Sequence, residues 1–517
     1  MTPSFTVLFL PSGITARAPQ DTTVLEAARA CGLPLTADCG GNGICGKCIV
    51  EVLDGPMPGW HPACRLRVQG DMRIRIPQES VGQFLSDVTT TCALLCNDER
   101  LPRSANEPVY PMAAFDIGTT SLVCYLLDGR TGRELSVSSM LNPQTVFGAD
   151  VITRIHHVLA HGENDLHTIL IQAMNTLLAN VCRMAAVSPV SVYLLAAAGN
   201  TCMHHLLLKL PLVTLATAPF QPALRHSLTL DAEALGLAAH PRAKLQVLPN
   251  IAGFVGADTV AGLIASSLAD SDELMLLIDI GTNGEMVLGD KHGRTACSTA
   301  AGPAFEGSHI RCGMRGANGA IDHVRLHDGR MDYTAIGGGA PQGLCGSGLV
   351  DLVAVLLDAG VIDTGGRFAK VPKWEARMAL ADGQKVFRLD NKIFLTQKDV
   401  RELQLAKAAM AAGIKLLCAE RGVSIIDIRK VAVAGAFGNY LDPRSACRIG
   451  LLPRELLNRI QSIGNAAGEG VKRVLRDPAL WRQAEELAFG TRYLELAARA
   501  DFQDCFVAEL NFPETPI

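Results

Sequence analysis

Short apolar stretches and alternating apolar and polar positions dominate the first 77 residues of the chain. Successive side chains of a strand point to opposite faces, so such alternation is typical of a half-buried strand. The pattern predicts strands at residues 6–10, 15–18, 48–52 and 72–76. Residues 23–31 predict a helix, which Asp21 or Thr22 could cap and which carries Glu26 in its first turn. We therefore expect a small domain over residues 1–78 and a linker over residues 79–110.

Two longer apolar regions further along the chain contain similar sequences. Residues 115–121 read FDIGTTS, and residues 278–285 read IDIGTNGE. Each segment lies between two apolar runs and is therefore predicted to form the turn of a β-hairpin. Glycine lets such a turn aim backbone N–H groups at phosphate oxygens, and threonine hydroxyls add further donors. Seen twice, the pattern predicts phosphate contacts from Gly118, Thr119, Thr120, Gly281, Thr282 and Asn283.

An aspartate precedes each of these turns. Asp116 and Asp279 could hold Mg²⁺ through water, and we expect both to take part in catalysis. A third apolar strand, residues 431–434, runs into a glycine turn and a helix. There the backbone of Gly435, Ala436 and Gly438 could approach a flat base or a ribose closely. The sequence contains no G-x4-G-K-[ST] motif, so a P-loop nucleotide site is not supported.

Four of the sixteen cysteines, Cys39, Cys45, Cys48 and Cys64, follow a C-x5-C-x2-C…C pattern. The loop between the first three contains four glycines, which let a backbone turn its N–H groups inward toward the sulfur atoms of an iron–sulfur cluster. Structural zinc usually takes two close cysteine pairs, and this pattern has one. We expect these four cysteines to ligate a 2Fe–2S cluster, with zinc or no metal as the alternatives.

The composition narrows the class of protein. The 517 residues are too many for one ordinary domain. With 48% hydrophobic and 19% charged residues and a net charge of -4, the chain is predicted to be neither disordered nor a nucleic-acid binder. Residues 5–10 are too short for a signal peptide, and no apolar run approaches the roughly 18 residues that span a membrane. We expect a soluble cytoplasmic protein with mostly reduced cysteines and no membrane partner.

The cysteine loop and its neighbouring elements resemble the plant-type and adrenodoxin-type 2Fe–2S ferredoxins, which implies a β-grasp fold. The segment between Cys48 and Cys64 is shorter than that resemblance suggests, which leaves Cys92 or Cys96 as less favoured fourth ligands. The pair at positions 92 and 96 could also bind something else, although incidental placement is the simpler interpretation.

The two hairpin turns and residues 431–439 resemble the phosphate-1, phosphate-2 and adenosine motifs of the superfamily of sugar kinases, heat-shock chaperone ATPases and actin. That resemblance implies two RNase H-like lobes, residues 111–270 and 271–517, with ATP in the cleft between them. By likeness to carbohydrate kinases, Asp258 could orient or deprotonate an attacking water, or it could merely cap its helix. Residues 345–348 predict a glycine turn before the helix 349–357. This turn could contact the nucleotide, or it could form a tight crossover within the lobe.

A ferredoxin domain fused to such an ATPase, together with residues 142–150, 199–201, 301–307 and 464–467, resembles the reductive activators of corrinoid-dependent enzymes. The resemblance implies that ATP drives one electron from the 2Fe–2S cluster to an inactive Co(II) corrinoid, restoring Co(I). It also implies two partners, a corrinoid protein of a methyltransferase system and an upstream electron donor. Residues 78–110 are too few for the middle domain that this family leads us to expect there.

Two other functions agree with the same motifs. Both phosphate turns and Asp258 would suit a small-molecule kinase with a fused redox-sensing ferredoxin domain. Alternatively, the chain could be an electron carrier whose ATPase lobes only switch partner binding.

Overall fold

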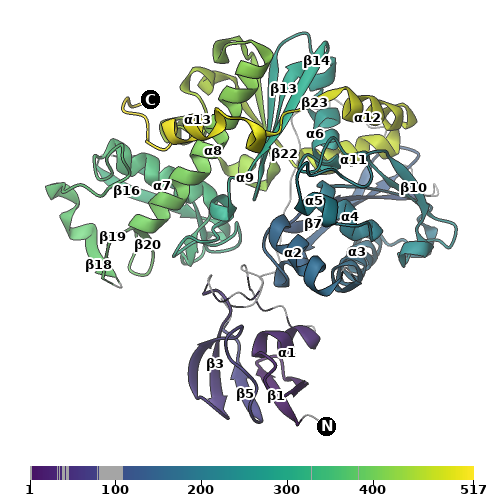
Figure 1. The fold of residues 1–517 in the computed structure, drawn as a ribbon, viewed down its shortest axis with the longest axis horizontal. Helices are drawn as coiled ribbons and strands as arrows, with labels where there is room; N and C mark the ends of the chain where they lie inside the picture. Colours follow the sequence, from purple (N-terminus) through teal and green to yellow (C-terminus); the bar gives the residue numbers. More distant parts are fainter. Residues whose placement is uncertain are drawn as a thin grey trace.

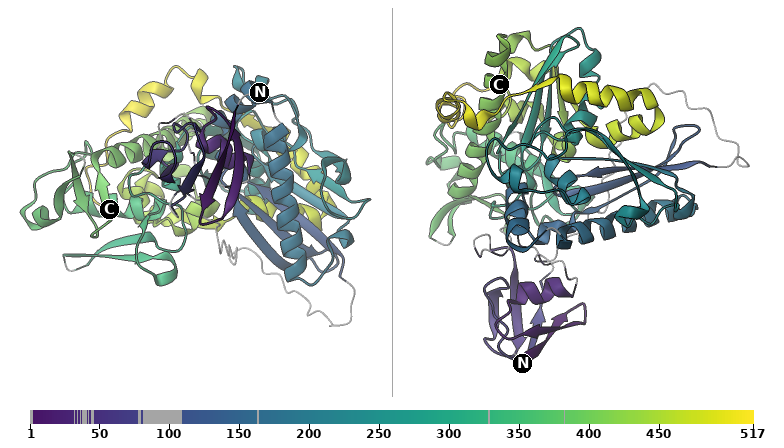
Figure 2. Two further views of the ribbon diagram at one scale, coloured as in Figure 1. Left: turned by 90° about the horizontal axis from the view of Figure 1, so that it is seen from below. Right: turned by 45° about the vertical axis from the view of Figure 1, so that its right-hand side comes forward.

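The computed structural model describes residues 3–517 except residues 32, 34, 36, 38–40, 42, 44, 45, 78, 79, 81–108, 163, 328 and 382. Figure 1 shows the small N-terminal domain in purple below two larger α/β lobes, one blue to teal and the other mainly green. The yellow helices α11 Ala466–Arg476 and α12 Pro478–Gly490 return to the blue lobe, whereas the yellow segment that follows them ends beside the green lobe, as Figure 2 shows from two other directions.

The N-terminal domain is a mixed five-stranded sheet in the order β2-β1-β5-β3-β4. Its strands are β1 Ser4–Leu10, β2 Ile14–Pro19, β3 Ile49–Asp54, β4 Gly59–Pro62 and β5 Met72–Arg75, and its helix is α1 Val24–Ala30. Strand β1 pairs antiparallel with β2 and parallel with β5. The alternate residues Val7 and Phe9 of β1 are fully buried beneath the helix residues Val24 and Leu25. This arrangement confirms the β-grasp prediction.

The expected cap of helix α1 was wrong by one or two residues. Thr23 caps the helix, because its hydroxyl accepts the Glu26 N–H at 3.2 Å while the Glu26 carboxylate accepts the Thr23 N–H at 2.7 Å. This reciprocal pair is a capping box, which satisfies two N–H groups at once. Asp21 instead has a φ of 66°, and the cap is neither Asp21 nor Thr22.

Each of the two lobes is built on a six-stranded sheet, with strand orders β10-β11-β9-β6-β7-β8 and β22-β21-β12-β13-β14-β23. The first contains β6 Pro111–Ile117, β7 Ser121–Asp128, β8 Glu134–Leu141, β9 Leu194–Gly199, β10 Leu228–Asp231 and β11 Lys244–Val247. The second contains β12 Met275–Ile280, β13 Gly284–Asp290, β14 Gly293–Thr299, β21 Lys430–Ala434, β22 Ile460–Gly464 and β23 Thr491–Tyr493.

The two sheets share one connectivity. In the first, β6, β7 and β8 form an antiparallel meander, β9 pairs parallel with β6, and β11 pairs parallel with β9. In the second, β12, β13 and β14 form the meander, β21 pairs parallel with β12, and β22 pairs parallel with β21. This duplication agrees with the predicted pair of RNase H-like lobes and puts the two hairpins in equivalent places.

Two further three-stranded sheets belong to the segment between β14 and β21, with orders β16-β15-β17 and β18-β19-β20. Their strands are β15 Ala320–His327, β16 Arg330–Ala335, β17 Gly343–Leu344, β18 Met378–Ala381, β19 Gln384–Arg388 and β20 Phe394–Thr396. The remaining helices are α2 Val151–His161, α3 Asn164–Met184, α4 Thr201–Leu208, α5 Val213–Ala216, α6 Ala257–Ser266, α7 Gly346–Asp358, α8 Gln397–Arg421, α9 Gly435–Tyr440, α10 Pro443–Arg448, α11 Ala466–Arg476, α12 Pro478–Gly490 and α13 Phe502–Ala508.

Helices α6 and α11 join the two lobes through one shared core. Alanines of the first sheet, such as Ala114 and Ala196, belong to the same buried cluster as Leu277 of the second sheet and residues of both helices. The helices cross closely at Gly470, where an added Cβ would lie 2.0 Å from the carbonyl oxygen of Ala261. Helix α11 therefore lies against the first lobe although it directly follows β22, a strand of the second.

Candidate functional site

A cavity of about 270 Å³ lies where the two hairpins face each other. It is lined by Asp116, Gly118, Thr119, Thr120, Ser121, Val123, Asn200, Asp258, Asp279, Ile280, Gly281, Thr282, Asn283, Glu285, Phe305, Glu306, Arg315, Gly316, Cys345, Gly346, Ser347, Gly435, Phe437, Asn439, Tyr440, Asn465 and Ala467. Both lobes therefore contribute to one cleft, and ten of the predicted nucleotide or catalytic residues line it.

Each of the two predicted turns is closed by a hydrogen bond from its glycine N–H, to the third residue along in the first turn and to the second residue along in the second. The Gly118 N–H donates to the Ser121 carbonyl at 3.0 Å, and the Gly281 N–H donates to the Asn283 carbonyl at 2.9 Å. A Cβ at Gly118 would lie 2.7 Å from the Ser121 oxygen, so this tight turn requires glycine. The turns thus bring the two threonine-bearing loops to opposite sides of the cleft.

Four carboxyl groups of the cleft are poorly solvated. Burial raises the pKa of Asp116 to about 7, opposed by a hydrogen bond from Asn465 and reinforced by the charge of Asp279. Burial raises the pKa of Asp279 to about 6. Burial and the neighbouring aspartates raise the pKa of Asp258 to about 7 and that of Glu285 well above its ordinary value. Such a concentration of carboxylates favours a bound cation, which would offset their repulsion.

The described residues contain no group of three or more His, Cys, Asp or Glu side chains close enough to hold a metal ion directly. Asp258 lies in the first turn of α6, whose N-cap is Gly256, and its own carboxylate accepts the Thr259 N–H at 2.8 Å. Asp258 is therefore not the N-cap of its helix, and it faces the cleft.

Asn465 was missed as a site residue, and it ties the start of α11 to the first hairpin. Its amide donates to Asp116 at 2.7 Å and to the Tyr125 hydroxyl at 3.1 Å. Its side-chain oxygen accepts the Gly468 N–H at 2.8 Å and so caps the helix. The segment 464–467 was noticed in the sequence only as part of a resemblance, because Asn465 and Asp116 lie 349 positions apart.

A buried polar network supports the first hairpin from behind. The Asn142 amide donates to the Gly118 carbonyl at 2.8 Å, and the Asn142 N–H donates to the Thr120 carbonyl at 2.9 Å. The fully buried Arg154 guanidinium donates to the Thr119 carbonyl, and to the Gly148 carbonyl at 3.0 Å. Three successive carbonyls of the turn therefore face away from the cleft.

Arg154 is a buried cation behind this turn. Burial lowers the pKa of Arg154 to about 10, so the guanidinium stays charged at neutral pH. Its Nη1 also donates to the Gln144 side chain at 3.1 Å. A fixed positive charge beside a turn that faces a cleft favours an anion in that cleft.

The adenosine-type motif divides into residues that face the cleft and residues that pack. Gly435 lines the cleft with a φ of 89°, and a Cβ there would lie 2.6 Å from Asp279 Oδ1. Gly438 does not line the cleft, and a Cβ there would lie 2.9 Å from the Val433 side chain, so this glycine lets α9 pack on β21. Ala436 lies in α9, and its side chain is outside the described part of the structure.

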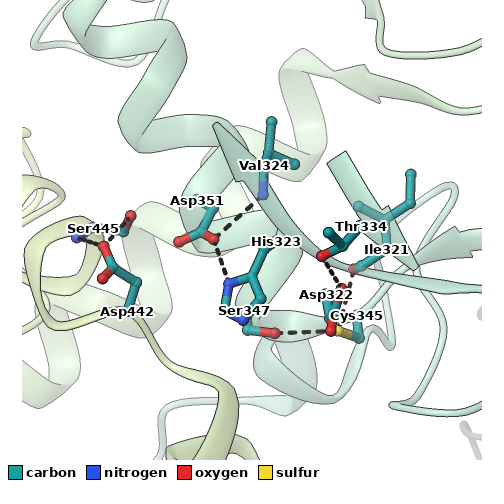
Figure 3. Close-up of polar contacts among 10 residues, drawn as sticks. All are labelled: Ile321, Asp322, His323, Val324, Thr334, Cys345, Ser347, Asp351, Asp442 and Ser445. Carbon is teal, nitrogen blue, oxygen red and sulfur yellow. Dashed lines mark hydrogen bonds and ion pairs between the residues drawn. The ribbon is translucent and has the colours of Figure 1, made fainter. Parts of the chain in front are cut away.

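The predicted glycine turn before α7 contributes Cys345, Gly346 and Ser347 to the cleft. Figure 3 shows how this end of the helix is held: the Cys345 thiol donates to the Ile321 carbonyl at 3.2 Å. One turn further on, Asp351 accepts from His323 Nδ1 at 2.9 Å, which joins α7 to β15. The hydrogen bond that His323 donates to the Asp351 carboxylate raises the pKa of His323.

In the N-terminal domain, the predicted cluster ligands Cys48 and Cys64 lie together. Their sulfur atoms are 3.4 Å apart, and both side chains are buried. Two sulfur ligands about 2.3 Å from one tetrahedral metal would lie about 3.8 Å apart, so this pair fits a shared metal. Gly41, Gly43 and Gly46 have φ values of 101°, 75° and 65°, as expected of a loop that turns inward. Cys39 and Cys45, like Cys92 and Cys96, lie outside the described residues.

None of the helices in the described part of the chain is both long enough and apolar enough to cross a bilayer.

Three protein-family models match the chain. A 2Fe–2S iron–sulfur cluster binding domain matches residues 8–72, which favours the iron–sulfur interpretation over zinc. The RACo middle region matches residues 112–271, and the C-terminal domain of RACo, the ASKHA domain, matches residues 273–517. The match to the middle region begins at residue 112, so the expectation that residues 78–110 are too few for a further domain stays a prediction. The family's middle region corresponds to the lobe built on the first six-stranded sheet.

Two curated relatives and one solved structure cover most of the chain. The corrinoid activation enzyme RamQ of Eubacterium limosum is 32% identical over 575 residues, covering 95% of this chain and 96% of that protein. The [Co(II) methylated amine-specific corrinoid protein] reductase of Methanosarcina barkeri is 25% identical over 433 residues, covering 77% and 76%. The structure of a reductive activator for corrinoid, iron–sulfur protein is 30% identical, covers 98% of both chains and superposes with a TM-score of 0.74. The chain belongs to the family of reductive activators of corrinoid proteins.

Proposed function

We propose that this protein is an ATP-hydrolysing reductase that passes one electron from a 2Fe–2S cluster to the Co(II) of a corrinoid protein and so regenerates Co(I). The observation that carries the proposal is the pair of aspartate-led hairpins facing one cleft, in a chain that also holds a buried cysteine pair in a ferredoxin fold. The names of the relatives support the acceptor, a corrinoid protein of a methyltransferase system. An upstream donor would reduce the cluster, and the reaction would take place in the cytoplasm.

Distinct groups of residues would do this work. Cys39, Cys45, Cys48 and Cys64 would hold the cluster, which when bound would supply the electron. Gly118, Thr119, Thr120, Gly281, Thr282, Asn283, Gly435 and Ala436 would form the nucleotide site, and Gly438 would support it by letting α9 pack on β21. Asp116 and Asp279 would hold Mg²⁺ through water, and Asp258 would orient the attacking water from the first turn of α6.

Reduction of Co(II) to Co(I) is uphill from an ordinary 2Fe–2S donor, so ATP binding must supply free energy that makes the electron transfer favourable. A nucleotide that closes the lobes could favour a form that grips the Co(II) partner. Shifting a conformational equilibrium from 1:99 to 99:1 takes about 5.5 kcal/mol of differential binding. For one electron this free energy corresponds to about 240 mV, which a protein interface can supply. A preference for the Co(II) partner over the Co(I) partner would give the reaction its direction.

The test is to mix the chemically reduced protein with a purified Co(II) corrinoid protein and to follow the visible absorption of Co(I) with and without Mg-ATP. We expect Co(I) only with ATP, and its loss in Cys45→Ser and Asp279→Ala. Cys31→Ser and Asp272→Ala are matched controls, because Cys31 follows α1 outside the predicted ligand set and Asp272 is an exposed residue just before β12. Absence of ATP-dependent Co(I), despite an intact cluster and measurable ATP hydrolysis, would exclude the proposed acceptor.

A further inference from the structure

One carboxylate ties the two phosphate turns together. Glu306 Oε2 accepts the Thr120 hydroxyl at 2.8 Å, and Glu306 Oε1 accepts the Thr282 hydroxyl at 2.6 Å. Thr120 belongs to the first hairpin and Thr282 to the second, so this bridge crosses the cleft from lobe to lobe. Glu306 was missed as a site residue, since it lies 186 positions from Thr120.

A threonine hydroxyl has a single hydrogen to donate. In this structure two of the three threonine hydroxyls that were predicted to meet phosphate oxygens, those of Thr120 and Thr282, donate instead to Glu306. A carboxylate offers two anionic oxygens, each able to accept such a bond, much as a phosphate group does. Glu306 and a nucleotide phosphate would therefore compete for the same donors, and their negative charges would repel each other.

The position of Glu306 is built into the surrounding loop. Glu306 ends a short 3-10 helix, Pro303–Glu306, and Gly307 follows it with a φ of 75°. A Cβ at Gly307 would lie 2.4 Å from the Met314 carbonyl oxygen, so the backbone there is closely packed. On the other side, the Phe305 ring lies 5.0 Å from that of Phe437 in α9. The loop thus presents the carboxylate to the cleft from a fixed base.

We propose that Glu306 is an internal competitor for nucleotide phosphate: it holds the hydroxyls of Thr120 and Thr282 while no nucleotide is bound, and phosphate oxygens displace it. The inference rests on the proposed function, in which this cleft binds ATP. It adds a positioning residue that sets the affinity for the phosphate part of the nucleotide. Because the bridge joins the two hairpins, its exchange for phosphate would also link nucleotide binding to the contact between the lobes.

The test compares Glu306→Ala and Glu306→Gln with wild-type protein by calorimetric titration of Mg-ATP and of adenosine. We expect both variants to bind Mg-ATP about tenfold more tightly, while adenosine, which has no phosphate, binds all three proteins equally. We also expect a lower thermal midpoint for the nucleotide-free variants and a larger increase when Mg-ATP is added. Glu375→Gln is the matched control, an exposed glutamate of another 3-10 helix outside the cleft.

Equal or weaker Mg-ATP binding by the folded Glu306 variants would overturn the inference, because a residue that only supports the fold would lower affinity when removed. Glu306→Gln keeps the size of the side chain and one acceptor oxygen, so it provides the same comparison if the alanine variant does not fold. Failure of the wild-type protein to bind Mg-ATP would instead refute the proposed function. The two failures are therefore distinguishable.

Discussion

Replacing Gly470 with alanine should push helix α11 away from helix α6 and weaken the union of the two lobes. The new Cβ would lie 2.0 Å from the Ala261 carbonyl oxygen and 2.6 Å from the Ala261 Cα. These are backbone atoms of another helix, which cannot rotate away as a side chain can. Gly262→Ala is the matched control in the same crossing, since its Cβ would meet Leu277 Cδ2 at 3.4 Å and Ala466 Cβ at 3.9 Å, which are ordinary contacts.

The magnitude follows from two opposing terms. Carbon and oxygen normally stay about 3.3 Å or more apart, so the helices must separate by roughly 1.3 Å at Gly470. Overpacking of a rigid site costs about 3 kcal/mol, and replacing a helical glycine with alanine returns about 1 kcal/mol. Gly470→Ala should therefore lose about 2 kcal/mol, while Gly262→Ala should gain about 1 kcal/mol.

Thermal unfolding and ATP titration of both variants would measure this difference. At about 2–4 °C per kcal/mol, Gly470→Ala should lower the midpoint by about 4–8 °C and Gly262→Ala should raise it by about 2–4 °C. Because α11 begins at Asn465, whose amide donates to Asp116, we also expect weaker Mg-ATP binding by Gly470→Ala. Changes of the same sign and size in both variants would refute the reasoning, since only one crossing glycine lacks room.

Three further predictions test other parts of the molecule. Arg154→Met should lower the free energy of unfolding by about 3 kcal/mol, because it leaves buried acceptors such as the Thr119 carbonyl unpaired. It should also weaken Mg-ATP binding. Chemical denaturation would measure the first effect and calorimetric titration the second. The His323–Asp351 pair faces Asp322 and Arg325, and the pKa of His323 is raised in the folded state. The pair therefore adds to the free energy of unfolding fully below the ordinary histidine pKa of 6.5, and this contribution is lost as pH rises through the raised pKa. Unfolding of Asp351→Asn and wild-type protein should therefore differ by about 1 kcal/mol at pH 6 and by less at pH 9. Cys64→Ser should abolish the visible absorption of the reconstituted cluster but leave Mg-ATP binding unchanged.

Local sequence signals predicted much of this structure. The hairpin turns were placed correctly because a glycine turn between two apolar runs is a local pattern. The capping box of α1 also has a local sequence signal, because Thr23 and Glu26 are three residues apart, as the motif requires. The prediction of Asp21 or Thr22 as the cap overlooked that signal. Strand β4, Gly59–Pro62, was missed because it is short and begins and ends with residues that disfavour strands.

Long-range contacts account for most of what sequence reasoning missed. Glu306 and Asn465 reach the phosphate turns from positions 186 and 349 residues away, and no periodicity connects such distant positions. The glycines of the adenosine-type motif look alike in sequence. Only packing shows that Gly435 faces the cleft while Gly438 makes room for Val433.

The return of helix α11 to the first lobe determines when that lobe can be completed during synthesis. The lobe's own strands and α6 have all left the ribosome roughly 200 residues before α11 is made, which at usual translation rates is about 10–40 s. Throughout that interval the alanine-rich face around Ala114 and Ala196 lacks part of its cover. The first lobe to be translated is thus completed only by a helix near the end of the chain, after most of the second lobe has been synthesised.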